Sequence, residues 1–161
     1  MMVWKFPLES DIHKIEITGG RVLIYNKATG ELLKEHKGYN YLYTGDVSPD
    51  NTDFFALENG KHFYVYSLKD FELKKKITLP RAFESIDHLG FYSEDGKTIN
   101  IPASKYVYTN KEKSEGYYEY VLFHYSTENY SLTGKTKLES HDDYEWDNNA
   151  YIKDWMAKSA F

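Results

Sequence analysis

The chain of 161 residues has no cysteine, which excludes disulfide frameworks, thiolate nucleophiles and thiolate metal sites. No run of 18 consecutive apolar residues is present, so no membrane-spanning helix is expected. Alanine occurs only seven times, which disfavours a helical bundle. The net charge of −5 lacks the basic excess typical of nucleic-acid-binding domains. We therefore expect neither a nucleic-acid nor a membrane partner.

A secretion signal is also lacking at the start, where Pro7 and Glu9 interrupt any apolar stretch, so a cytoplasmic location is expected. What is abundant favours β-strands. Valine, isoleucine, threonine and the aromatic residues together make up 53 positions, a third of the chain. Short strand-like runs are separated by turn pairs such as Asn59-Gly60 and Asp95-Gly96, which supply the positive φ angles of tight hairpins. This pattern predicts an antiparallel all-β domain.

An internal repeat is visible in three of these runs. Each ends in a tyrosine followed by a small polar residue, and a leucine stands seven residues after each tyrosine. The three pairs are Tyr25 and Leu32, Tyr66 and Leu73, and Tyr125 and Leu132. The tyrosines are 41 and 59 residues apart, and the excess of 18 falls in the polar segment 105–116. A period near 40 residues with several strands per unit is typical of β-propeller blades.

The residues of the repeat also resemble a known family. Residues 22–33 are similar to the third strand, turn and outer strand of a WD40-like or YVTN-type blade. Residues 48–51 and 93–96 resemble the turn between that family's first and second strands. The Gly-His pair that precedes such blades and the Trp-Asp pair that ends them are absent. The resemblance implies about three four-stranded antiparallel propeller-like blades.

The expected blades can be placed along the chain. Their strands are predicted at 3–6, 12–18, 21–26 and 32–36, at 39–48, 52–58, 62–67 and 72–79, and at 82–93, 98–103, 117–126 and 132–138. Three blades leave two free sheet faces, each expected to be apolar. A second copy completing a six-bladed ring would cover them, and so would the C-terminal segment. A third possibility is that the chain is not a propeller but a barrel or sandwich built from duplicated hairpins.

The last 22 residues differ from the rest, so we divide the chain into a β domain at 1–139 and an acidic segment at 140–161. Asn148 or Asn149 is suited to cap a short C-terminal helix. Tyr151 and Trp155 would then share one face, either docked on the sheets or offered to a partner. The basic run 74–76 fits a solvated edge strand protected by lysines.

Candidate chemistry is sparse, and no catalytic constellation is indicated. The densest group of metal ligands is His141, Asp142 and Asp143, a weak candidate because it lacks the spacing and glycine of a calcium loop. A solvated acidic linker is the preferred interpretation. We predict no metal and no cofactor.

Sixteen tyrosines are unusual in a chain of this length. Tyr39, Tyr41 and Tyr43 alternate along one predicted strand and would share a face. With Tyr151 and Trp155 they are the candidate binding residues. The strand near 117–126 carries large side chains on both faces, which predicts that both faces are covered.

The first functional hypothesis is a non-catalytic protein-binding or scaffold module, whose blades could be completed by homodimerisation. A small acidic cytoplasmic inhibitor of the immunity-protein type is one alternative. A glycan-acting enzyme or glycan-binding module that uses the tyrosine-rich surface is another. Fold alone supports none of these over the others.

Overall fold

A computed structural model describes residues 8–58, 60–86 and 90–138, which form thirteen antiparallel strands and no helix. The first sheet contains β1 (Leu8–Glu9), β2 (His13–Thr18), β3 (Arg21–Asn26) and β4 (Leu32–Lys37). The second contains β5 (Leu42–Val47), β6 (Asp53–Glu58), β7 (His62–Ser67) and β8 (Leu73–Thr78). The third contains β9 (Glu84–Ser85), β10 (Phe91–Tyr92), β11 (Thr98–Tyr108), β12 (Gly116–Ser126) and β13 (Leu132–Lys137).

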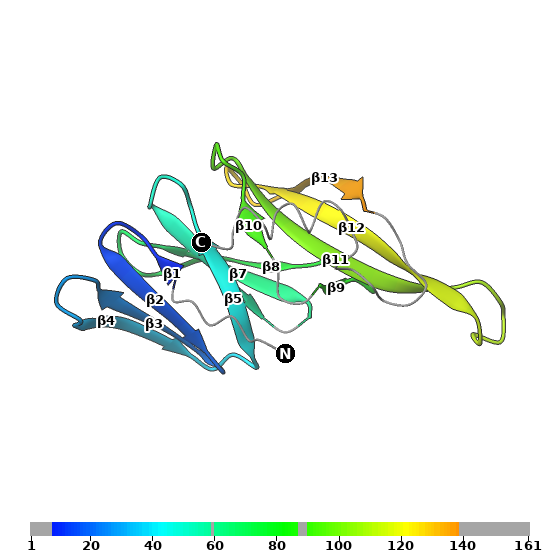
Figure 1. The fold of residues 1–161 in the computed structure, drawn as a ribbon, viewed down its shortest axis with the longest axis horizontal. Coiled ribbons are helices and arrows are strands. Elements are labelled where there is room, and N and C mark those ends of the chain that lie inside the picture. The colour runs from blue at the N-terminus through cyan, green and yellow to red at the C-terminus, as the bar shows by residue number, and fades with distance from the viewer. Residues whose placement is uncertain (1–7, 59, 87–89, 139–161) are drawn as a thin grey trace.

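The three sheets lie side by side as successive blades, with the second between the first and the third (Figure 1). Consecutive strands are neighbours in every sheet except the third, where β9 and β10 both pair with β11. The prediction of about three antiparallel propeller-like blades is confirmed. The predicted strand at 3–6 and the predicted C-terminal helix lie outside the described residues. Within these residues no helix is long and apolar enough to cross a membrane.

The tyrosine and leucine repeat marks the same irregularity in each blade. The tyrosine that ends the third strand pairs with the leucine that begins the fourth, and the register shifts immediately before it. The pairs are Tyr25 with Leu32, Tyr66 with Leu73, and Tyr125 with Leu132. The spacing therefore identified three copies of one bulged hairpin.

The turns between the first and second strands of the later two blades share one hydrogen-bond pattern. Ser48 Oγ donates to Asp50 Oδ1 over 2.7 Å, and Ser93 Oγ donates to Asp95 Oδ1 over the same distance. Each serine Oγ also accepts from the backbone N–H five residues on. Because these bonds are local, the sequence could specify the turns directly. The predicted turns at residues 48–51 and 93–96 are confirmed.

The turn before the outer strand places one residue of each blade at positive φ: Gly30, Phe71 and Tyr130, at 74°, 65° and 59°. In the later blades this residue is aromatic and packs on the preceding blade. The Phe71 ring lies 5.2 Å from that of His13, and Lys74 Nζ of the second blade lies 5.7 Å from the Tyr130 ring centre. No blade precedes the first in the described chain, and the position is glycine.

The second blade is buried on both faces. Residues 54–57 of β6 and 63–66 of β7 are continuously buried instead of alternating. One face packs on the first blade, where Tyr66, which stacks on Phe54 of its own blade, lies 4.8 Å from the His36 ring of the first. The other face packs on the third blade through Phe55, Phe63 and their neighbours. Each fully buried side chain of this size stabilises the fold by about 2 kcal/mol, so the two seams between blades form the core.

The free face of the first blade carries charged pairs beside the half-buried Leu23 and Tyr25, so the expectation of an apolar face is wrong. Lys14 pairs with Glu16 at 3.3 Å, and Arg21 pairs with Glu35 at 3.6 Å across the strands. These residues alternate with Ile15 and Val22, which are fully buried against the second blade. A strand with one face in water and one in the core alternates in this way. On the third blade, the face that points away from the second blade does carry an apolar cluster, formed by Ile86, Tyr120, Leu122 and Leu138.

Three strands differ from prediction, and the first is β11, which continues to Tyr108 instead of ending at residue 103. β5 begins at Leu42 instead of at residue 39, because the preceding residues cross from the first blade and Leu42 N donates to Gly19 O. The strand expected at 82–93 is two short pieces, β9 and β10. They flank the segment opposite Pro102, which has no N–H for the ladder. The expectation that lysines protect an exposed outer strand is confirmed at β8, where residues 74–76 are exposed.

Candidate functional site

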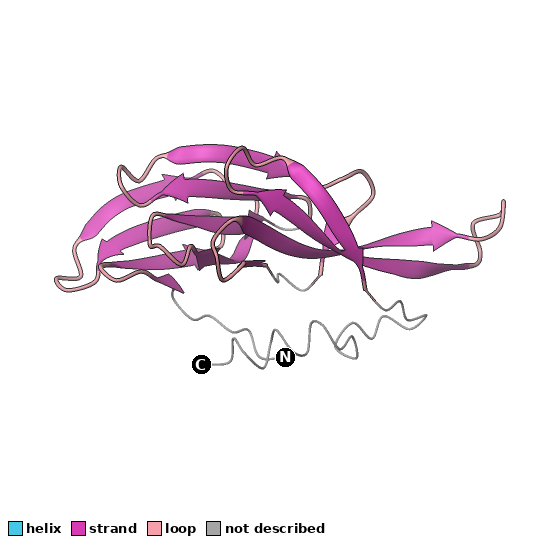
Figure 2. Cartoon of the chain, turned by 90° about the horizontal axis from the view of Figure 1, so that it is seen from above, coloured by secondary structure: helices cyan, strands magenta, loops and turns pink. Residues whose placement is uncertain are grey.

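The long hairpin of β11 and β12 projects beyond its own blade (Figures 1 and 2). The two strands pair over eleven positions, from Thr98 with Ser126 to Tyr108 with Gly116. β9 accompanies β11 only to Ser104, and β13 accompanies β12 only from Val121. Residues 105–108 and 116–119 therefore form a two-stranded extension, which we call the tyrosine ribbon.

Alternation along the ribbon collects tyrosines on one face. Tyr106 lies opposite Tyr118, and their ring centres are 5.1 Å apart. Tyr108 contacts Tyr106 at 5.0 Å, and Tyr118 stacks beside Tyr120 at 6.2 Å. Tyr108 is 51% exposed and Tyr106 is 40% exposed, whereas Tyr120 is buried. The row of rings thus extends from the apolar cluster of the third blade out into solvent.

Gly116 allows this arrangement. It stands opposite Tyr108, and a Cβ built on it would lie 2.6 Å from the Tyr106 ring and 2.3 Å from Val107 O. Real Cβ atoms do not approach backbone oxygen so closely, so any larger residue would push the ring or the strand aside. The Tyr106 ring therefore covers the position where a side chain is missing.

The other face of the ribbon is less aromatic. Lys105 pairs with Glu119 at 3.7 Å, and its Nζ lies 4.9 Å from the centre of the Phe83 ring. The loop at the tip is ordered by Asn110, whose Oδ1 accepts from Ser114 N over 3.0 Å. These contacts fix the base and the tip of the ribbon, so the exposed rings are held on a defined support.

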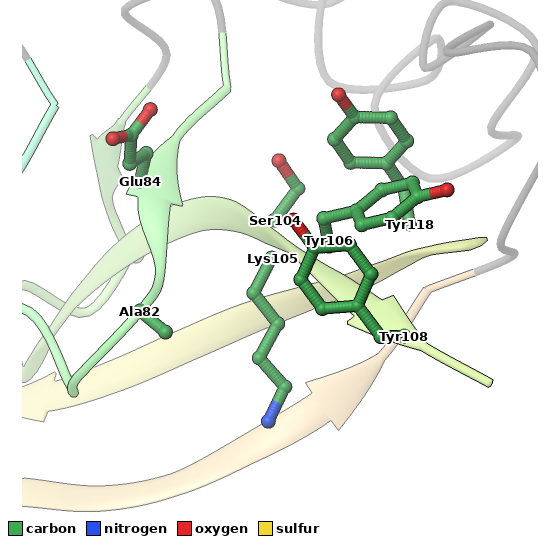
Figure 3. Close-up of a pocket in the computed structure, with 7 residues that line it drawn as sticks. All are labelled: Ala82, Glu84, Ser104, Lys105, Tyr106, Tyr108 and Tyr118. Atoms are coloured by element: carbon green, nitrogen blue, oxygen red, sulfur yellow. The ribbon is translucent and has the colours of Figure 1, made fainter. Parts of the chain in front are cut away.

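A groove with a volume of about 380 Å³ lies at the base of the ribbon. Figure 3 shows Ala82 and Glu84 on one side and three tyrosine rings on the other. The groove is lined by Ala82, Glu84, Ser104, Lys105, Tyr106, Tyr108 and Tyr118. It combines aromatic surface with a carboxylate, a hydroxyl and an ammonium group.

The carboxyl with a raised pKa lies elsewhere. Asp46 on β5 accepts a hydrogen bond from Tyr92 N at 2.8 Å, which joins the second blade to the third, and a local one from its neighbour Val47 N at 2.9 Å. Burial raises the pKa of Asp46 to about 6, and the two backbone donors partly oppose this effect. Since both oxygens hold backbone N–H groups, we assign Asp46 a structural role.

The sequence-derived binding residues are separated by the fold. Tyr39 lies in the seam between the first two blades, where its hydroxyl accepts a hydrogen bond from Tyr66 and its ring lies 4.7 Å from that of Tyr64. Tyr41 is 47% exposed, and Tyr43 belongs to β5. Tyr39 and Tyr41 precede the strand, so the prediction that all three share one strand face is wrong.

The remaining sequence candidates are not placed by the structure. Tyr151, Trp155, His141, Asp142 and Asp143 lie outside the described residues. Within 8–58, 60–86 and 90–138, no group of three His, Asp or Glu side chains is arranged to hold a metal ion.

Sequence reasoning missed Tyr106, Tyr108 and Tyr118, although two signals pointed to them. The repeat shows that the third unit has 18 extra residues, and the polar segment 105–116 accounts for up to twelve of them. Tyr106 and Tyr108 also alternate at the start of that segment, as Tyr118 and Tyr120 do just after it. The segment was interpreted as a polar insertion because its centre is charged, whereas its two ends continue the strands.

Comparison with known proteins supports the fold. The chain resembles hydrazine synthase from Kuenenia stuttgartiensis with a TM-score of 0.62 and 12% identity, over 81% of this chain and 36% of that one. It resembles the C-terminal WD40 domain of Sif2 with a TM-score of 0.50 and 16% identity, over 57% and 28%. The chain has a propeller-like fold.

A further match is the WD40 β-propeller domain of Doa1, with a TM-score of 0.47 and 21% identity, over 57% of this chain and 30% of that domain. This chain thus spans about a third of the length of the structures it matches. No family model and no curated sequence matches it. At these identities the likeness shows the fold alone, so function has to be argued from the site.

Proposed function

We propose that this chain is a protein-interaction module in which the blades form a rigid support and the tyrosine ribbon makes contact with a partner. The observation that carries the proposal is the exposure of Tyr106 and Tyr108 on a hairpin that projects from the sheets. Tyrosine buries a large area while only two side-chain torsions are fixed, and it is therefore enriched among the residues that dominate binding energy.

The ribbon also has the support that such a contact needs. Its rings brace one another at 5.0 to 5.1 Å, and the row is continuous with the buried Tyr120. A partner would therefore lose little binding energy to the ordering of loose side chains. An inhibitor of the immunity type is a special case of this proposal, in which the partner is a toxin.

Affinity capture from cell extract with quantitative mass spectrometry tests the proposal. The double variant Tyr106→Ser/Tyr108→Ser should lose the captured protein, which is then purified and titrated against wild type. Two buried anchors are worth at least about tenfold in affinity. Leu73→Ser, at a residue 44% exposed on β8, is the matched control and should bind normally. Loss of binding in Tyr41→Ser, with the double variant unaffected, would contradict the proposal and favour the sequence-derived site.

Glycan binding is a second candidate, favoured by the presence of Glu84 and Tyr106 in one groove. Sugars stack on aromatic rings and donate hydroxyl hydrogen bonds to carboxylates. A glycan array probed with wild type and with Glu84→Gln distinguishes the two candidates. Sugar binding that depends on Glu84, without a captured protein, would replace the first proposal.

A further inference from the structure

The edge of β11 that faces β9 is paired only in part. β9 matches Ser85 to Ala103 and Glu84 to Ser104, and there the pairing ends. Immediately beyond, Ala82 adopts a φ of 71°, a value at which an L-residue leaves the extended conformation. Among the described residues, no strand continues along this edge beside residues 105–108.

Hydrogen bonds in the hairpin show which residues face this edge. Thr109 N donates to Glu115 O at 2.9 Å, and the two positions continue the β11 and β12 register. In an antiparallel pair, hydrogen-bonded positions recur at every second residue. The odd-numbered residues of β11 therefore bond to β12.

The even-numbered residues point the other way. Ile86 N donates to Pro102 O at 2.9 Å, which places the backbone groups of Pro102 on the β9 side. The same alternation places those of Ser104, Tyr106 and Tyr108 on that side. Beyond Ser104, the backbone donors and acceptors of Tyr106 and Tyr108 thus face an edge that no described strand covers.

The groove occupies the place where β9 would have continued. Ala82, just before β9, and Glu84, the first residue of β9, form one wall of the groove. Tyr106 and Tyr108 form another (Figure 3). Lys105 is paired with Glu119, whereas Glu84 has no ion-pair partner among the described residues. The groove therefore presents unpaired strand backbone, aromatic walls and one uncompensated negative charge.

We infer that this edge binds an extended peptide of a protein partner, which adds antiparallel to β11 beside Tyr106 and Tyr108. The peptide carries an apolar or aromatic side chain for the groove and a lysine or arginine that pairs with Glu84. Main-chain hydrogen bonds give such strand addition its affinity, and the pockets beside it give specificity. The inference rests on the proposed function, because it names the chemistry by which the ribbon takes its partner.

A proline scan along the edge tests the inference. Tyr106→Pro removes the ring and the N–H that faces the edge, whereas Tyr106→Thr removes the ring and keeps the N–H. β11 already contains Pro102 on the same side, so a proline with this orientation is compatible with the strand. Tyr108→Pro and Tyr108→Thr form a second pair, which replaces the first if circular dichroism shows that Tyr106→Pro is unfolded.

The probe is a phage-displayed library of random dodecapeptides selected on the wild-type protein, with the selected peptides then synthesised and titrated. We expect basic peptides with an aromatic or aliphatic residue. They should bind the proline variant about three- to tenfold more weakly than the threonine variant, the value of one backbone hydrogen bond. Glu84→Gln should weaken them as well.

Equal affinity for the proline and threonine variants at both positions would overturn the inference, and so would a library that yields no binder. These outcomes are separable from failure of the proposed function. If the captured protein still depends on the rings of Tyr106 and Tyr108, the ribbon is a binding surface that uses side chains alone. If capture does not depend on the rings either, both proposals fail.

Discussion

The seam between the second and third blades contains a group that should make stability fall as pH rises. Asp46 is half-buried there, with its oxygens accepting from Tyr92 N and Val47 N, and its pKa is raised from 3.8 to about 6. Between these two pH values the folded protein keeps the Asp46 proton, whereas the unfolded chain has lost it. Unfolding then releases a proton, so the free energy of unfolding decreases with rising pH.

The size of the effect follows from the pKa values. Each pH unit in the interval lowers the free energy of unfolding by about 1.4 kcal/mol, so wild type loses about 3 kcal/mol from this group between pH 3.8 and pH 6. Asp46→Asn removes the titration, while its amide oxygen can still accept from Tyr92 N. The variant should therefore gain about 3 kcal/mol relative to wild type across the interval.

Urea denaturation at half-unit steps from pH 3.5 to 7.5, followed by fluorescence, measures this difference. Other carboxyls act on both proteins equally and cancel in the comparison. Asp95→Asn is a control of opposite sign. Hydrogen bonds from Ser93 Oγ and Lys97 N lower the pKa of Asp95, so wild type should gain stability relative to this variant as pH rises. A difference between wild type and Asp46→Asn that stays constant over the whole pH range would refute the reasoning.

Three further predictions concern the blades. Gly45→Ala should unfold the second blade, because the alanine Cβ would lie 1.7 Å from Phe55 O. Circular dichroism would detect the lost strand structure, and a native spectrum would contradict the prediction. Gly30→Phe should destabilise the protein by about 1–2 kcal/mol, because positive φ is strained for phenylalanine and no described blade lies there for the ring to pack on. Phe71→Gly should also destabilise the protein, because its packing on the first blade is lost. Thermal melts measure both variants, and a Gly30→Phe variant more stable than wild type would contradict the prediction. Arg21→Glu should leave the mass measured by light scattering unchanged, because the charged pairs on the free face of the first blade are unsuited to closing a six-bladed ring with a second copy. A wild-type dimer that dissociates in this variant would show that the face does mediate ring closure.

Much of the fold could be predicted because its signals are local. The Ser48 and Ser93 turns are closed by side chains two to five residues away, so their sequences specify them without help from the rest of the chain. The tyrosine and leucine pairs repeat because every blade has the same bulged hairpin. Periodicity could not reveal where Tyr39 would lie, since Tyr39 leaves the strand pattern to reach Tyr66 of the same seam.

The sequence by itself determined that this chain is an antiparallel β-protein with three repeated units, because turn chemistry and strand alternation act between near neighbours. Tertiary structure alone decided which surfaces face water. The charged pairs on the free face of the first blade reach water because no described blade lies beside Lys14 and Arg21. The tyrosine ribbon exists because β9 and β13 end before β11 and β12 do. Whether a strand keeps a neighbour depends on distant segments of the chain, and no local pattern contains that information.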